Sequence, residues 1–539
     1  MKTFKGTNAS PGWSSSKAFL LNNEINFNNT AKLNIMRGLE ILTNKYESLI
    51  SELKSSNREL EAEIILGYKL ILNDPEILTE IEDLETKDIK TIHSIFLNAA
   101  EQMNLLENEY FKQRSEDILS VGKELILTMQ EAHQDKVKDE EVIIIAKDLT
   151  PTDTSSLNLK NVKGFIVEKA GPTSHTVIIA KNLGIPCVIG LKLENFEGHN
   201  DSMIVIDGSS GNVYVEPTNE ILDQVRNYQL LNLDVASNYT QDNIIKLGIE
   251  FRANIGSEEE LEIFNDKIIN SVWLFRSEFI YINSDRPPTL EEQIGINNKI
   301  DSKFSGAVVF RTLDIGRDKQ VPYLNLPEEE NPFLGVRGIR LSLVDEKIFR
   351  EQIVSILSSK LLPKVKIMFP MVALLEDFLK AKDIVVNEAQ NLGVEVPKLG
   401  VMIETPAAAI GAESFIGHVD FFSIGTNDLV QYTLAADRGL SSLADYQDSL
   451  HPSVLYLINK VIEVGKLHNI EVSVCGDMAS DIEGAKILYS LGLRIFSLAP
   501  SQAPLILDSI LKFIDSGRKL DKNEILVQKN SQNVRKLIE

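Results

Sequence analysis

The sequence predicts a multidomain α/β protein in which a helical bundle is inserted in a small α/β domain and a C-terminal (β/α)8 TIM barrel follows. Three observations support this prediction. The chain has 539 residues, which is too long for one hydrophobic core. Apolar residues between positions 31 and 140 recur every three or four residues, as on one face of a helix. Beyond Glu141, short β-branched segments alternate with helical stretches.

The first long segment, residues 31–140, is predicted to be almost entirely helical. Asn73-Asp74-Pro75 interrupts it, and further helices are expected around Ile89–Leu97 and Asn108–Gln130. The segment contains 13 Lys and Arg residues and 23 Asp and Glu residues. An acidic bundle is compatible with a solvated surface and equally with a docking face for a basic partner.

A compact α/β unit is predicted next, ending near Pro217. A helix is expected within it at about Thr176–Asn182, and a connecting helix follows at Glu220–Ser237. Its predicted strands are Val142–Ala146, Gly164–Val167, Pro186–Ile189, Met203–Ile206 and Asn212–Val215.

Eight apolar strands separated mostly by helical stretches then predict a barrel, whose active site would lie at the carboxyl ends of the strands. These strands are Phe251–Ile255, Val272–Phe275, Ala307–Phe310, Val365–Phe369, Leu399–Ile403, Phe421–Ile424, Glu471–Val474 and Ile495–Ser497. We therefore expect the small α/β domain at residues 1–20 and 143–217, the bundle at 21–142, a linker helix at 218–249 and the barrel at 250–539.

Composition narrows the possible partners. The net charge of −23 disfavours general binding of nucleic acid or of anionic membrane surfaces. No apolar run approaches the length of a membrane span, and the first residues do not resemble a signal peptide. The two cysteines, Cys187 and Cys475, do not form a disulfide framework or a zinc signature. These features predict a cytoplasmic protein with no nucleic-acid partner and no membrane insertion.

His175 is the candidate nucleophile. It follows Thr173 and Ser174 at the predicted start of a helix, where backbone N–H groups favour negative charge. A neutral imidazole at such a place can attack a phosphoryl group and carry it covalently. Most lone histidines are instead surface or satisfied core residues, and the motif is only moderately specific.

Cationic side chains that follow the predicted barrel strands suggest a clamp for phosphate or carboxylate groups, because a guanidinium binds both anions bidentately. The alternative for each is an ordinary surface ion pair. The candidates are Arg276, Arg311, Lys319, Arg337 and Arg438.

Two carboxylates, Glu404 and Asp428, follow neighbouring predicted strands. Carboxylates with open positions suit Mg²⁺, although either residue alone would be read as a structural or helix-capping carboxylate. Cys475 ends another strand and precedes a glycine. It is either inert filling or a general acid or base in a cation-rich site.

Taken together, these motifs resemble enzyme I of the phosphoenolpyruvate:sugar phosphotransferase system, the phosphoenolpyruvate-protein phosphotransferase family. The resemblance extends over nearly the whole chain and keeps the family order. Its motifs are Ala9-Ser10-Pro11-Gly12, Asp148-Leu149-Thr150-Pro151, Thr173-Ser174-His175-Thr176, Ala253-Asn254-Ile255-Gly256, Arg276-Ser277-Glu278-Phe279, Arg311-Thr312-Leu313-Asp314-Ile315-Gly316, Glu330-Asn331-Pro332-Phe333-Leu334-Gly335, Gly400-Val401-Met402-Ile403-Glu404-Thr405-Pro406, Phe422-Ser423-Ile424-Gly425-Thr426-Asn427-Asp428-Leu429 and Cys475-Gly476.

The resemblance implies a cytoplasmic homodimer that starts the sugar phosphotransferase pathway. Phosphoenolpyruvate would bind at the barrel mouth with Mg²⁺ on Glu404 and Asp428, and His175 would take its phosphoryl group, supported by Thr173 and Ser174. Cys475 would protonate the enolate of pyruvate, and the small carrier protein HPr would receive the phosphoryl group on the helical insert. The α/β domain would swivel between the two partners. The implied substrate-binding residues are Arg276, Arg311, Lys319, Arg337, Asn427 and Arg438.

The chain also departs from the family pattern. Ala170-Gly171-Pro172 stands where Gly-Gly-Arg is usual, Ser271 and Trp273 stand where small residues are expected, and Asp477 replaces a common Glu. These departures leave open an alternative, a catalytically weakened regulatory paralogue that binds phosphoenolpyruvate. Phosphoenolpyruvate synthase and pyruvate phosphate dikinase are disfavoured, since about 140 helical residues without a Gly-rich phosphate loop precede the histidine unit.

Overall fold

The computed structural model divides the chain into two compact units, Met1–Asn227 and Tyr228–Glu539, each described below by itself. The described residues are 1–21, 35–55, 59–82, 88–104, 109–129, 140–149, 153–154, 157–159, 161–170, 174–238, 244–245, 247–256, 269, 271–282, 286–316, 321, 323–324, 326, 328–438, 441–518 and 520–538.

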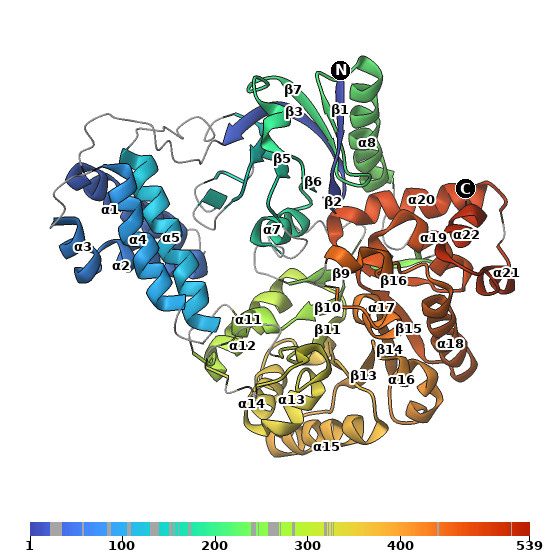
Figure 1. The fold of residues 1–539 in the computed structure, drawn as a ribbon. Helices are drawn as coiled ribbons and strands as arrows, with labels where there is room; N and C mark the ends of the chain where they lie inside the picture. Colours follow the sequence, from blue (N-terminus) through green and yellow to red (C-terminus); the bar gives the residue numbers. More distant parts are fainter. Residues whose placement is uncertain are drawn as a thin grey trace. The chain divides into compact units, whose positions relative to one another are not determined.

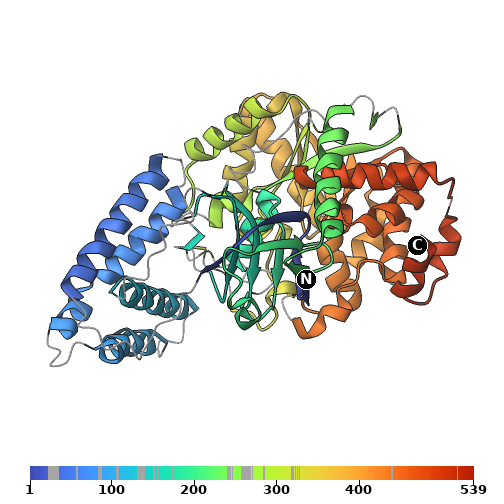
Figure 2. The same ribbon diagram turned by 90° about the horizontal axis from the view of Figure 1, so that it is seen from above.

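In the first unit, the described helices α1 to α5 form the bundle (Figures 1 and 2). The predicted break is present: Asp74 Oδ1 accepts a hydrogen bond from the backbone N–H of Glu76 at 2.9 Å, and Pro75 opens the next helix. Close packing of two helices requires Gly122, because a Cβ there would lie 2.4 Å from the ring of Phe96. The bundle helices are α1 (Ile35–Ser55), α2 (Glu59–Leu72), α3 (Pro75–Glu82), α4 (Ile89–Asn104) and α5 (Glu109–Met129).

The same unit contains an eight-stranded sheet among its described residues, with strand order β1-β8-β7-β3-β4-β5-β6-β2. Strand β3 pairs in parallel with β4, in register from Lys17 with Val142 to Leu21 with Ala146. Because the bundle lies in sequence between these paired strands, it is an insertion in the α/β domain, as predicted. The elements are β1 (Lys2–Lys5), β2 (Thr7–Ser10), β3 (Trp13–Leu21), β4 (Val142–Ala146), β5 (Val162–Val167), α7 (His175–Leu183), β6 (Cys187–Ile189), β7 (Met203–Asp207) and β8 (Asn212–Val215).

Residues 1–20 were assigned to the α/β domain without any predicted strand, whereas the structure has three strands there. They carry many Ser, Thr and Lys residues and lack a strong alternating pattern. Their place in the sheet comes from pairing with strands about 120 to 210 residues later in the chain. The helix α8 (Asn219–Asn238) follows the sheet, close to the predicted connecting helix.

The second unit is a closed barrel whose eight described strands are all parallel, which confirms the predicted (β/α)8 architecture (Figure 1). The strands are β9 (Glu250–Ile255), β10 (Val272–Arg276), β11 (Val308–Arg311), β12 (Val365–Phe369), β13 (Lys398–Ile403), β14 (Phe421–Gly425), β15 (Glu471–Cys475) and β16 (Ile495–Leu498). Its helices are α11 (Glu278–Ile282), α12 (Leu290–Lys303), α13 (Ile339–Val344), α14 (Glu346–Leu357), α15 (Leu375–Leu392), α16 (Pro406–Ile410), α17 (Thr426–Leu434), α18 (Pro452–His468), α19 (Ile482–Ser490), α20 (Ala503–Asp515), α21 (Lys522–Leu526) and α22 (Ser531–Ile538).

Trp273 fills part of the barrel interior. Its side chain is fully buried, and the rings of Trp273 and Phe421 are 5.2 Å apart. The guanidinium carbon of Arg252 lies 3.6 Å from the centre of the Trp273 ring, and Lys366 Nζ lies 4.2 Å from it. Glu471 accepts hydrogen bonds from both cations. Trp273 is therefore packed between two cations that share one carboxylate.

None of the helices in the described ranges combines the length and the apolar character that crossing a bilayer requires.

Candidate active site

Ion pairs link carboxylates and arginines across the carboxyl ends of the barrel strands. Arg311, the last residue of β11, pairs with Glu278 through Nη2, and its Nη1 lies 3.1 Å from Asp314 Oδ2. Arg311 also faces Arg276, the last residue of β10, in the strand register. Burial alone would lower the pKa of Arg311, but Glu278 and Asp314 outweigh burial and raise it. The guanidinium is therefore held charged in a buried place.

Arg337, in the loop before α13, forms further ion pairs with this group of side chains. It is fully buried, and its Nη2 lies 3.2 Å from Asp314 Oδ1 while its Nη1 lies 3.4 Å from Asp428 Oδ1. The other oxygen of Asp428 lies 3.0 Å from Arg438 Nη1. The result is an alternating series of charges at the mouth, in the order Glu278, Arg311, Asp314, Arg337, Asp428 and Arg438.

Glu404 follows β13 and is almost completely buried. One of its oxygens accepts a hydrogen bond from the backbone N–H of Met371, a residue held at a φ of +56°. Burial, and then the negative charges of Asp428 and Asp314, raise the pKa of Glu404 well above its usual range. Strands β13 and β14 are neighbours, so both predicted metal ligands come from adjacent strand ends.

Cys475 ends β15 and is fully buried. Its Sγ lies 3.5 Å from the carbonyl oxygen of Ile424 and 3.5 Å from Ser423 Oγ. Burial raises the pKa of the thiol to about 11, although the positive charges of Arg311 and Arg276 act in the opposite direction. The group is thus a neutral thiol at pH 7, close to two cationic side chains.

Asn427 joins the starts of two neighbouring loops. Its Oδ1 accepts a hydrogen bond from the backbone N–H of Asp477 at 2.9 Å. Gly476 between Cys475 and Asp477 has a φ of +101°, and a Cβ there would lie 2.4 Å from Thr426 Oγ1. A glycine is therefore needed at this turn.

In the first unit, α7 begins at His175, as the sequence predicted for a helix start. The hydroxyl oxygen of Ser174 is buried and has no hydrogen-bond partner among the described residues. Thr173 and Lys319 lie outside the described residues, as does the side chain of His175.

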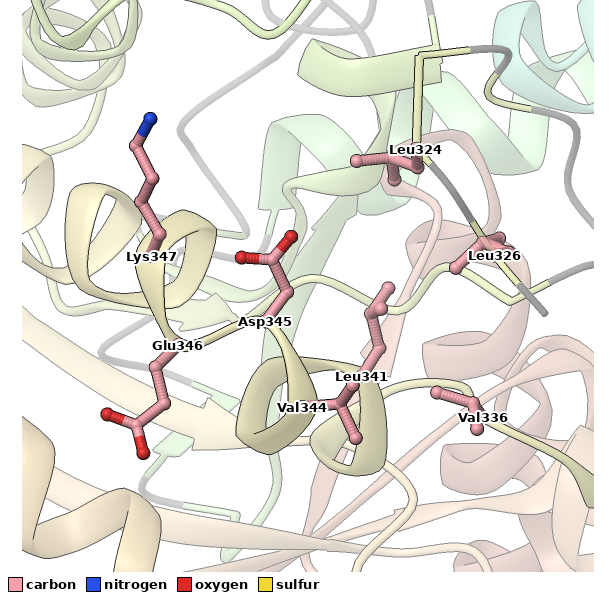
Figure 3. A pocket seen from close by; sticks show the side chains of 8 residues that line it. All are labelled: Leu324, Leu326, Val336, Leu341, Val344, Asp345, Glu346 and Lys347. Carbon is pink, nitrogen blue, oxygen red and sulfur yellow. The ribbon is translucent and has the colours of Figure 1, made fainter.

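A separate pocket of about 400 Å³ lies beside α13 (Figure 3). Leu341 and Val344 of α13 line it together with Leu324 and Leu326 of the preceding loop. None of the predicted site residues is among the described residues that line it. The pocket is therefore not the place to which the predicted site residues converge.

The barrel thus brings together Arg311, Arg337, Asp428 and Arg438 through direct ion pairs, with Arg276, Glu404 and Cys475 at neighbouring strand ends. The sequence analysis assigned no role to Glu278 or to Tyr432. Glu278 had a visible signal, a carboxylate two residues after a strand end. Tyr432, whose hydroxyl donates to the carbonyl of Phe333 and lies 3.4 Å from Arg337 Nη1, had none.

Comparison with protein families places the two folds in one class, the phosphoenolpyruvate-utilising enzymes. The family model described as "PEP-utilising enzyme, PEP-binding domain" matches residues 234–513, and "PEP-utilising enzyme, mobile domain" matches residues 138–211. The barrel and its mouth thus fall within the first match, and His175 falls within the second.

Relatives that match almost the whole chain identify one family within this class. Phosphoenolpyruvate-protein phosphotransferase of Listeria innocua is 37% identical over 97% of this chain and 95% of its own length. The proteins of the same name from Staphylococcus aureus MRSA252 and Priestia megaterium are 37% and 36% identical, with the same coverage. The chain belongs to the phosphoenolpyruvate-protein phosphotransferase family.

Proposed function

We propose that this chain transfers the phosphoryl group of phosphoenolpyruvate to His175 and then to a histidine of the carrier protein HPr, the first step of the sugar phosphotransferase system. The observation that carries the proposal is the alternating series of arginines and carboxylates at the barrel mouth, most of them buried. A small substrate with a phosphate and a carboxylate needs several fixed guanidinium groups in one place.

The arginines form the anion clamp in this proposal. Arg311 and Arg337 are buried and oriented by carboxylates, so little side-chain entropy remains to be lost when an anion binds. Arg438 is about one-third exposed, so it is the most accessible of these three arginines. Arg276, Asn427 and Lys319 complete the proposed binding set.

Mg²⁺ fits the carboxylates of Glu404 and Asp428. No group of three or more His, Cys, Asp or Glu side chains suited to a metal occurs among the described residues. Mg²⁺ does not require one, since it commonly uses one or two carboxylates together with waters and substrate phosphate oxygens. Burial, and after it the negative charges of Asp428 and Asp314, raise the pKa of Glu404, and a divalent cation would relieve this crowding of negative charge.

The proposed reaction breaks the P–O bond of phosphoenolpyruvate and forms a P–N bond with an imidazole nitrogen of His175. Bound Mg²⁺ supplies positive charge that stabilises the negative charge developing on the substrate. Arg311 and Arg337 hold the anion, and the buried Ser174 hydroxyl is available as a donor to the phosphoryl oxygens. The Cys475 thiol then gives its proton to C3 of the enolate, and pyruvate leaves.

The proposed partners are HPr on the acidic bundle and a second copy of the chain through the barrel. Two docked states of the α/β domain are part of the proposal, because His175 has to approach two phosphorus positions to roughly 3–3.5 Å.

Labelling with ³²P-phosphoenolpyruvate and Mg²⁺ tests the proposal. We expect acid-labile label on the wild-type chain, passed to HPr on its addition. His175→Ala should remain unlabelled and still bind phosphoenolpyruvate, whereas His468→Ala, at the exposed end of α18, should label normally. A wild-type chain that binds phosphoenolpyruvate without becoming labelled would support the regulatory paralogue instead.

A further inference from the structure

A buried glutamine lies behind the loop that carries Arg311 and Asp314. Gln352 is on α14, in the helix layer outside the strands, and is 1% exposed. The face of α14 around it is largely apolar, including Phe349, Ile353 and Ile356. A buried amide in such a place is costly unless it is hydrogen-bonded, so its partners show what it holds.

The amide of Gln352 connects the ends of two neighbouring strands. Its Oε1 accepts a hydrogen bond from the backbone N–H of Leu313 at 3.0 Å, and its Nε2 donates to Ser277 Oγ at 3.0 Å. Ser277 is fully buried, and its hydroxyl donates to the carbonyl oxygen of Arg311 at 2.7 Å. The amide oxygen thus bonds directly to the backbone of the Arg311–Asp314 loop, and the amide nitrogen reaches that backbone through the Ser277 hydroxyl.

The loop after β11 is also anchored to the neighbouring strand β12. The backbone N–H of Thr312 bonds to the carbonyl of Met368 on β12 at 3.0 Å, which fixes one side of the loop. The contacts through Gln352 and Ser277 fix the other side. Arg311 and Asp314 lie at the two ends of this four-residue stretch, so rotation of its peptide units would change where both side chains point.

We propose that Gln352 and Ser277 are positioning residues that hold the Arg311–Asp314 loop in the geometry that binds and orients the substrate phosphate. The inference rests on the proposed function. Neither residue contacts substrate, and their effect passes through the Arg311 guanidinium. A displacement of about 1 Å at a reacting group can lower a rate by about 10²-fold. Loss of the hydrogen bonds through Gln352 and Ser277 should therefore lower turnover by more than the accompanying loss of folding stability would explain.

The test uses the full chain with ³²P-phosphoenolpyruvate and MgCl2. For Gln352→Leu we expect kcat/KM for self-phosphorylation to fall about tenfold or more, and for Ser277→Ala about fivefold. The double variant should match Gln352→Leu within about twofold, because both residues belong to one hydrogen-bonded chain. In Gln352→Glu the carboxyl accepts from Leu313, but it donates to Ser277 only when protonated. Its rate relative to wild type should therefore rise as the pH falls.

Ser355→Ala is the matched control. Ser355 is equally buried on α14, but its hydroxyl donates to the carbonyl of Gln352 at 2.7 Å and accepts from Asn297 at 3.4 Å. We expect it to lower Tm about as much as Ser277→Ala and to leave kcat/KM within about twofold of wild type.

Equal kcat/KM for Ser277→Ala and Ser355→Ala would overturn the inference, as would a fully active Gln352→Leu. If Gln352→Leu does not fold, the comparison of Ser277→Ala with Ser355→Ala still tests the inference. A wild-type chain that takes up no label would overturn the proposed function itself, which is a different result from unaffected variants of a labelled chain.

Discussion

The guanidinium of Arg337 lies against the carboxylate of Asp314, with Nη2 3.2 Å from one oxygen and 3.4 Å from the other. Both side chains are buried, and Asp314 also pairs with Arg311. One carboxylate therefore separates two positive charges that would otherwise repel each other. Asp314 therefore allows two buried guanidinium groups to lie close together.

Replacing Asp314 by Asn should destabilise the barrel by about 3 kcal/mol, because it leaves two buried guanidinium groups without their shared counter-charge. Urea unfolding measures this free energy. Asp301→Asn makes the same chemical change in a partly exposed pair with Lys364 and should cost less than about 1 kcal/mol. Equal costs for the two variants would mean that Asp314 is not the link between the arginines.

Glu404→Gln and Asp428→Asn should each raise the Mg²⁺ concentration for half-saturation about tenfold or more, since each removes one of two hard anionic ligands. Calorimetric titration of MgCl2 into protein and phosphoenolpyruvate measures the change. Glu413→Gln is the control, because Glu413 is exposed and paired with Lys460. Unchanged titrations in both site variants would refute the metal assignment.

Cys475→Ser should reduce pyruvate formation by orders of magnitude with the barrel still folded, because a serine hydroxyl is a far weaker acid than a thiol. The raised pKa of about 11 keeps the wild-type thiol protonated through neutral pH. Proton donation by Cys475 should therefore be constant between pH 6 and pH 9 and decline only above that range, where the thiolate begins to form.

The matched control for this variant is Cys187→Ser, the same change at the other buried cysteine, which lies on β6 of the first unit. Near-normal pyruvate formation by Cys475→Ser, or an equal loss in both variants, would indicate that Cys475 only packs in the core and does not donate the proton.

Trp273→Ala should destabilise the barrel by about 3–5 kcal/mol, because it removes a fully buried ring and leaves a cavity between two cations. Burial disfavours the charged form of Lys366 and lowers its pKa. Loss of the ring would also remove a cation–π contact that stabilises this charge. Guanidinium chloride unfolding measures the effect. Phe4→Ala, which lies in the first unit, is the control and should leave the unfolding transition of the barrel unchanged. A change below about 1 kcal/mol would show that the interior collapses onto the vacancy.

Trp273 is a residue whose presence is visible in the sequence but whose packing only the structure explains. The family resemblance indicates only that a large residue stands where a small one is expected. The structure accounts for it, because Arg252 and Lys366 come from strands about 20 and 90 residues away and converge on the ring. Convergence of this kind depends on barrel closure, which no local pattern contains.

The sequence was enough to predict the barrel, the bundle inserted before it and the strand-end residues Arg276, Arg311, Glu404 and Cys475, but not the three N-terminal strands. The predicted features follow from local period and from the rule that barrel strands end at one mouth. The tertiary structure was needed to show that Asp314 joins Arg311 to Arg337, and that Gln352, on an outer helix, hydrogen-bonds to the loop between Arg311 and Asp314. The physical reason is that ion pairs and buried amide bonds act over a few ångströms in space, between residues whose separation in sequence carries no periodic signal.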